Sequence, residues 1–155
     1  MRLSPVFLFA LLLAGPAAGQ GQRVWTFDDN PEAPALVYGL PDSDDILIMF
    51  SCDPDEKQMT IVEAVGAKKL NPGGKATFRL SAGAANLELT GDAVANETDG
   101  SVNIEVTGAP NPRVFALLKA GPSLTVEAGG EKETIPLADA APNVPALEKL
   151  CLAKK

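Results

Sequence analysis

Residues 44–56 read DDILIMFSCDPDE, an apolar run that ends in a cysteine and has carboxylates on both sides. Between Ile46 and Cys52 almost every residue is apolar, so a strand formed here is hydrophobic on both faces, as in the centre of a sheet. The flanking aspartates fall in loops, because Asp and Pro favour turns. The stretch therefore predicts a buried central strand rather than an acidic catalytic site.

The chain has two cysteines, Cys52 and Cys151, and no histidine. Two thiols are too few for a thiolate zinc or iron–sulfur site. Without histidine, imidazole metal ligands and histidine-activated nucleophiles are excluded. In an exported protein, two cysteines most simply form one disulfide. A Cys52–Cys151 bond would close a loop of about 100 residues and constrain the unfolded chain by roughly 4 to 5 kcal/mol.

The N-terminal stretch MRLSPVFLFALLLAGPAAGQ has one charge at Arg2, then an apolar segment, then small residues. This is the layout of a secretory signal peptide, and the apolar segment is about half of the roughly 20 residues that span a bilayer. We assign residues 1–19 to the signal peptide, with cleavage between residues 17 and 20. Residues 20–155 are expected to form a single β-rich domain in the periplasm or outside the cell, with no membrane span.

Acidic residues dominate the charge of the chain. The 155 residues include 13 Lys and Arg and 20 Asp and Glu, for a formal net charge of −7. Because Arg2 is the only charged residue in 1–19, removing this segment changes the charge to −8. Such a domain repels nucleic-acid phosphates and anionic lipid surfaces. We expect no nucleic-acid partner.

Short segments of alternating polarity, separated by turn residues, occupy most of the chain. Strands are expected at 22–27, 35–38, 46–52, 59–65, 75–80, around 87–89, at 102–106, and on both sides of Gly129-Gly130. The Gly129-Gly130 turn places Glu127 opposite Lys132, Thr125 opposite Thr134 and Leu124 opposite Ile135. A second turn, Asp99-Gly100, places Thr98 opposite Ser101 and Asn96 opposite Asn103.

Two segments carry helix signals. In APNPRVFALLKAGP, Asn111 can cap a helix that Pro112 begins and Gly121-Pro122 ends. In NVPALEKLCLAKK, Asn143 can cap, and one apolar face includes Cys151. The predicted fold is mainly β: an antiparallel β-sandwich or open barrel with two short helices, the C-terminal one disulfide-linked to a central strand.

Candidate interaction residues are aspartates in the predicted loops. They are Asp28, Asp29, Asp44, Asp45, Asp53 and Asp55. If these loops share one end of the fold, that end is an acidic interaction surface for an envelope or exported protein, and a basic one would be preferred. No acidic segment fits the EF-hand pattern, so we expect neither a metal nor another cofactor, although calcium binding remains an alternative.

We therefore predict an exported, non-enzymatic binding or protein-interaction module. Two alternatives stay open: an inhibitor of an exported hydrolase such as lysozyme, and a hydrolase that works with two carboxylates. The second is disfavoured, because no sequence spacing identifies an acid pair. Only six aromatic residues remain after residue 19, whereas a sugar-binding cleft usually needs exposed aromatic rings.

Several quoted segments also carry a family resemblance. Residues 112–151, PRVFALLKAGPSLTVEAGGEKETIPLADAAPNVPALEKLC, run from helix to hairpin to a helix ending in cysteine, and Trp25 and SDDILIMFSC lie upstream. This pattern resembles small periplasmic proteins of alphaproteobacteria and is more distantly similar to type VI secretion accessory proteins. The resemblance covers about half of the mature chain and implies a fold rather than a task. The distant family has an arginine where this chain has Ser51, so no functional residue is carried over.

Overall fold

The computed structural model describes residues 21–66, 68–97 and 100–153. The predicted signal peptide, the predicted position of Thr98 in a hairpin and the terminal lysines lie outside these residues. The described chain forms nine strands and two helices. Their bounds are β1 Val24–Asp28, β2 Ala35–Gly39, β3 Ile46–Asp53, β4 Gln58–Glu63, β5 Lys75–Ala82, β6 Ala85–Ala95, β7 Val102–Gly108, α1 Pro112–Leu118, β8 Ser123–Ala128, β9 Glu131–Pro136 and α2 Val144–Cys151.

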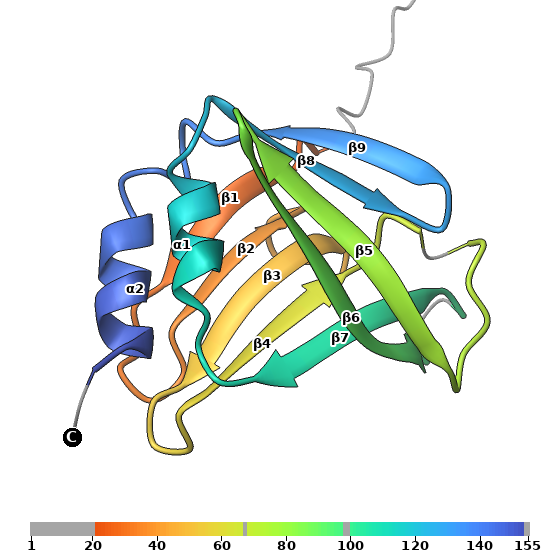
Figure 1. The fold of residues 1–155 in the computed structure, drawn as a ribbon, viewed down its shortest axis with the longest axis horizontal. Coiled ribbons are helices and arrows are strands. Elements are labelled where there is room, and N and C mark those ends of the chain that lie inside the picture. The colour runs from red at the N-terminus through yellow and green to blue at the C-terminus, as the bar shows by residue number, and fades with distance from the viewer. Residues whose placement is uncertain (1–20, 67, 98–99, 154–155) are drawn as a thin grey trace, which may run out of the picture.

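All nine strands belong to one sheet, in the order β1-β2-β3-β4-β7-β6-β5-β8-β9. Every neighbouring pair is antiparallel. The sheet curls on itself into a half-barrel, with α1 and α2 side by side at one end (Figure 1). The predicted mainly β fold is confirmed, and a single continuous sheet makes it an open barrel rather than a two-sheet sandwich.

The helices complete the core that the curled sheet leaves open. Helix α1 contacts β5 and β6 in one half of the sheet, and α2 contacts β2 and β3 in the other. Phe115 of α1 and Leu147 of α2 are fully buried, as is Phe50 on the inner face of β3. Burying such a side chain stabilises a fold by about 1.5–3 kcal/mol. The two helices therefore pack as parts of the hydrophobic core.

The predicted disulfide between Cys52 and Cys151 is confirmed. Cys52 lies near the end of β3 and Cys151 is the last residue of α2, with a Cα–Cα distance of 5.5 Å. Both residues are buried. The bond therefore joins the C-terminal helix to a strand that is third from one edge of the sheet.

One predicted hairpin register is confirmed and the other is wrong. The β8–β9 pairs match the prediction: Leu124 with Ile135, Thr125 with Thr134 and Glu127 with Lys132. In the β6–β7 hairpin, Asn96 does not face Asn103; its N–H donates to the Ser101 carbonyl, and Val94 faces Asn103. The last described pair of this hairpin is Ala95 with Val102. The shift is even, so every side chain keeps its predicted face.

The two predicted helix caps also differ. The Asn111 side chain accepts a hydrogen bond from the Arg113 N–H and caps α1 as predicted. Asn143 has helical dihedrals and its side chain makes no capping bond, so that prediction is wrong. The turn that precedes α2 supplies an acceptor for the first N–H of the helix, because the Val144 N–H donates to the Ala140 carbonyl.

Candidate functional site

The six candidate aspartates lie at two opposite ends of the strands, not at one. Asp28 ends β1, and Asp29 follows it in the turn to β2. Because β1 to β4 form an antiparallel meander, the β1–β2 and β3–β4 turns share one end. The β2–β3 loop lies at the other end. We call the first end, with Asp28, Asp29, Asp53 and Asp55, the acidic end.

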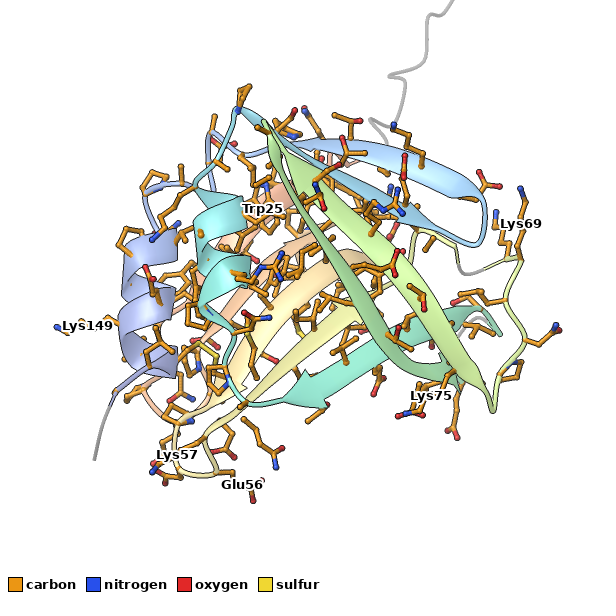
Figure 2. The ribbon with its side chains drawn as sticks, in the orientation of Figure 1. Trp25, Glu56, Lys57, Lys69, Lys75 and Lys149 are labelled. Atoms are coloured by element: carbon orange, nitrogen blue, oxygen red, sulfur yellow. A yellow bond between two sulfur atoms is a disulfide. The ribbon has the colours of Figure 1, made fainter. Side chains whose placement is uncertain are left out.

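Exposed carboxylates crowd the acidic end. The Asp28 carboxylate accepts the Asn30 N–H at 3.0 Å, and the Asp53 carboxylate accepts two backbone N–H groups of its own turn at 2.9 Å each. Glu32 and Glu56 extend the acidic surface and were not among the predicted residues. Figure 2 labels Glu56 on this turn, beside the one nearby cation of the turn, Lys57.

Asp44 and Asp45 lie at the opposite end, and Asp45 is paired. The Arg23 guanidinium contacts both Asp45 carboxylate oxygens, at 2.8 Å and 3.1 Å. This two-point contact neutralises the aspartate and ties the start of β1 to the β2–β3 loop. The pair is specific to the tertiary structure, since the two residues are 22 positions apart.

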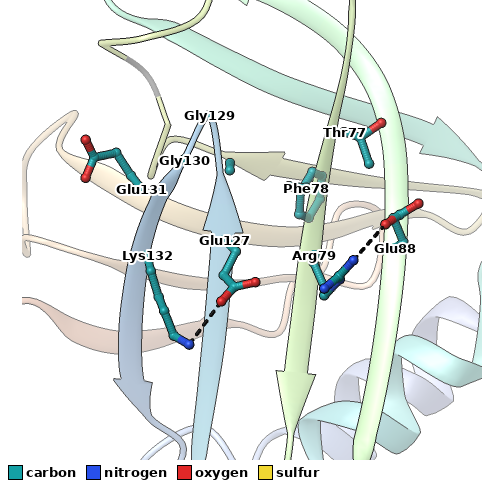
Figure 3. Close-up of a pocket in the computed structure, with 10 residues that line it drawn as sticks. Thr77, Phe78, Arg79, Glu88, Glu127, Gly129, Gly130, Glu131 and Lys132 are labelled. Atoms are coloured by element: carbon teal, nitrogen blue, oxygen red, sulfur yellow. Dashed lines mark hydrogen bonds and ion pairs between the residues drawn. The ribbon is translucent and has the colours of Figure 1, made fainter.

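The outer face of the second half of the sheet carries a row of alternating charges. Glu88, Arg79, Glu127 and Lys132 lie directly opposite one another across β6, β5, β8 and β9. Arg79 pairs with Glu88 at 3.3 Å and Lys132 with Glu127 at 3.0 Å (Figure 3). These residues line a shallow hollow of about 530 Å³. The sequence analysis predicted only the Glu127–Lys132 pair. The Arg79–Glu88 pair lies across the β5–β6 hairpin, whereas the position of Glu127 opposite Arg79 depends on the non-local pairing of β5 with β8.

Two glutamates of the hollow have lowered pKa values. The hydrogen bond and charge of Lys132 lower the pKa of Glu127, and those of Lys69 lower the pKa of Glu131. A two-carboxylate hydrolase needs one acid with a raised pKa to protonate the leaving group. Neither of these two glutamates has that property, so their electrostatics fit ion pairing rather than acid catalysis.

One buried carboxyl, Glu63, was missed by sequence reasoning. It faces the inside of the barrel between Ile48 and Ile104 and is 0% exposed. One oxygen accepts the N–H groups of Val65 and Gly66, and the other has no described partner. Burial raises its pKa to about 6, against the lowering effect of the two N–H donors. The alternation Met59, Ile61, Glu63 could have placed it inside.

No group of three or more Asp, Glu or Cys within residues 21–66, 68–97 and 100–153 is arranged to hold a metal ion. In the same part of the chain, no helix has the length and apolar character to cross a membrane.

Comparison of the chain with protein-family models, with curated proteins and with solved structures found no match. The resemblance to alphaproteobacterial periplasmic proteins therefore stays a prediction from the quoted sequence pattern.

Proposed function

We propose that the mature domain is an exported, non-enzymatic protein-interaction module that binds a basic partner protein through its acidic end. The observation that carries this proposal is the gathering of Asp28, Asp29 and Asp53 on two adjacent turns. No ion pair is described for these three aspartates, in contrast to Asp45 and the acids of the hollow. Uncompensated exposed carboxylates attract a positively charged surface and speed its association.

Export is supported by two features of different kinds. The N-terminal sequence has the layout of a signal peptide. The Cys52–Cys151 bond belongs to a class that persists in oxidising compartments such as the periplasm. A non-enzymatic role is supported by the lack of histidine and by the ion pairing of the hollow's acids.

The test is crosslinking in cells that make the protein, with the chain tagged and its N-terminal segment intact. Lys57 supplies an amine for an amine-reactive crosslinker within the acidic end. The test variant combines Asp28→Asn, Asp29→Asn and Asp53→Asn. Asparagine keeps the acceptor oxygen that holds each turn and removes only the charge. The control variant combines Glu88→Gln, Asp92→Asn and Glu127→Gln, which changes the net charge equally on another face.

We expect one basic protein to be captured by the wild type and the control, and to be lost or strongly reduced with the test variant. Raising the salt concentration before crosslinking should reduce the same product. Equal capture by all three forms, or capture that ignores salt, would show that the acidic end is not the contact surface.

A further inference from the structure

The half-barrel is open along one line, between its edge strands β1 and β9. Within the described residues, the only hydrogen bond that joins these strands runs from Trp25 Nε1 to the Pro136 carbonyl at 2.7 Å. An indole side chain bridges the strands, and no backbone ladder connects them. We call this gap the seam. The N–H and C=O groups along an unpaired strand edge can bind another extended chain.

The topology determines the direction of a strand that would fit. Each of the eight neighbouring strand pairs is antiparallel, so β1 and β9, first and ninth in the order, point the same way. A strand between them can therefore run antiparallel to both at once. It would close the open sheet into a fully antiparallel barrel, at the usual spacing of about 4.8 Å between strands.

A hollow of about 550 Å³ lies at the seam, because residues on both sides of the gap line it. Tyr38, Leu40 and the Arg23–Asp45 pair line it from the side of β1 and β2, and Glu133 lines it from β9. Glu133 belongs to the inner face, because it lies opposite Val126, which is fully buried. In the described part of the chain, Glu133 has no ion pair, whereas Glu131 pairs with Lys69 at 2.5 Å.

We propose that the seam binds an extended segment of a partner protein, antiparallel to both edges, with a lysine or arginine directed at Glu133. The aliphatic stem of such a residue would pack on Tyr38 and Leu40, and its cation would lie near the tyrosine ring and the carboxylate. Acids that point inward on an edge strand oppose apolar or acidic strands. The same acids therefore select a basic segment.

A second copy of this chain suits the seam less well. Antiparallel pairing of β9 with its own copy, centred on Glu133, sets Glu133 against Glu133. Centred on Lys132, it sets Lys132 against Lys132 and Glu131 against Glu133. Like charges directly opposite each other destabilise a strand pair. Charge complementarity thus favours a basic segment of a different protein.

The seam is a separate surface from the acidic end, so the two proposals can be tested apart. The probe is the peptide TVTKTVT with blocked ends, in which valine, lysine and valine lie on one face of a strand. Hydrogen–deuterium exchange of the folded domain is followed with millimolar peptide. We expect slower amide exchange within residues 22–24 and 131–134, at the alternate N–H groups that face the seam, because those groups become paired. The indole bond to Pro136 marks where pairing should stop.

Three comparisons decide the outcome. Glu133→Gln should weaken binding of the peptide about threefold to tenfold, whereas Glu88→Gln, with the same charge change on the outer face, should leave it unchanged. The peptide TVTETVT should bind far more weakly. The Asp28→Asn, Asp29→Asn, Asp53→Asn variant should bind TVTKTVT like the wild type, whatever its effect on partner capture. Equal binding of both peptides, slowed exchange elsewhere, or no slowing at millimolar peptide overturns the proposal.

Discussion

The indole of Trp25 donates a hydrogen bond to the carbonyl of Pro136, 111 positions away, and so links the first strand to the end of the last. The ring also lies against Tyr38, with the ring centroids 5.2 Å apart, and against Phe50. One side chain thus joins both edges of the sheet to the core. The bond links the two edge strands at one point.

Replacing this tryptophan should test the bond directly. We expect Trp25→Phe to lower the free energy of unfolding by about 1 to 3 kcal/mol, because the Pro136 carbonyl loses its donor and some ring contact is lost. Urea unfolding measures the change. Tyr38→Phe is the control, since no described bond uses the tyrosine hydroxyl, and its effect should be near zero. A Trp25→Phe protein as stable as the wild type would show that the link does not stabilise the fold.

Loss of the disulfide should destabilise the domain without preventing folding. Replacing Cys52 and Cys151 with alanine releases a constraint across 99 positions, and should reduce the free energy of unfolding by about 2 to 5 kcal/mol. Helix α2 should stay docked, because Val144 and Leu147 remain buried. Urea unfolding and circular dichroism measure both effects. A reducing agent should affect the wild type but not the variant; an unfolded variant would mean that the bond is needed to dock the helix.

Glu63 should make stability fall as pH rises. Its pKa is raised to about 6 in the fold, against about 4.5 for an ordinary glutamate, so the folded state binds the proton more tightly. The contribution of protonated Glu63 to the free energy of unfolding is complete below about pH 4.5. It is lost as the pH rises through 6, and the loss amounts to about 2 kcal/mol. Glu63→Gln should remove this loss. Urea unfolding at pH 4 to 7 gives the difference between the two proteins, and parallel profiles would contradict the assignment.

Replacing Gly66 with a larger residue should lower the free energy of unfolding. A Cβ atom there would lie 2.8 Å from the backbone of Ala128, so Gly66→Ala forces the β4–β5 loop away from the β8–β9 hairpin. We expect a loss of about 1 to 3 kcal/mol in the free energy of unfolding. Gly74→Ala is the matched control, because nothing lies within 4 Å of its Cβ position, and it should be neutral or slightly stabilising. If the two substitutions changed the free energy of unfolding equally, the β4–β5 loop would be able to shift away from the hairpin without cost.

Part of the acidic surface could have been placed correctly from the sequence. Consecutive antiparallel strands reverse direction, so the loops of a meander alternate between its two ends. Asp29 follows β1 and Asp45 lies in the loop after β2. Because β1 and β2 are antiparallel neighbours, the two residues lie at opposite ends of the sheet. The condition that the loops of all six aspartates share one end of the fold is therefore not met. The Arg23–Asp45 contact had no sequence signal, because nothing local specifies which residues a loop will meet.

Local patterns determined the elements of this protein. Alternating polarity predicted the strands, and the Gly129-Gly130 turn predicted the β8–β9 register. The presence of only two cysteines predicted one disulfide. These predictions succeeded because each depends on neighbouring residues or on a residue count. Only the tertiary structure decided that β4 pairs with β7 and β5 with β8. Those pairings depend on how the whole sheet curls around its core and helices. They place Arg79 between two glutamates, bury Glu63 and leave the seam between β1 and β9 open.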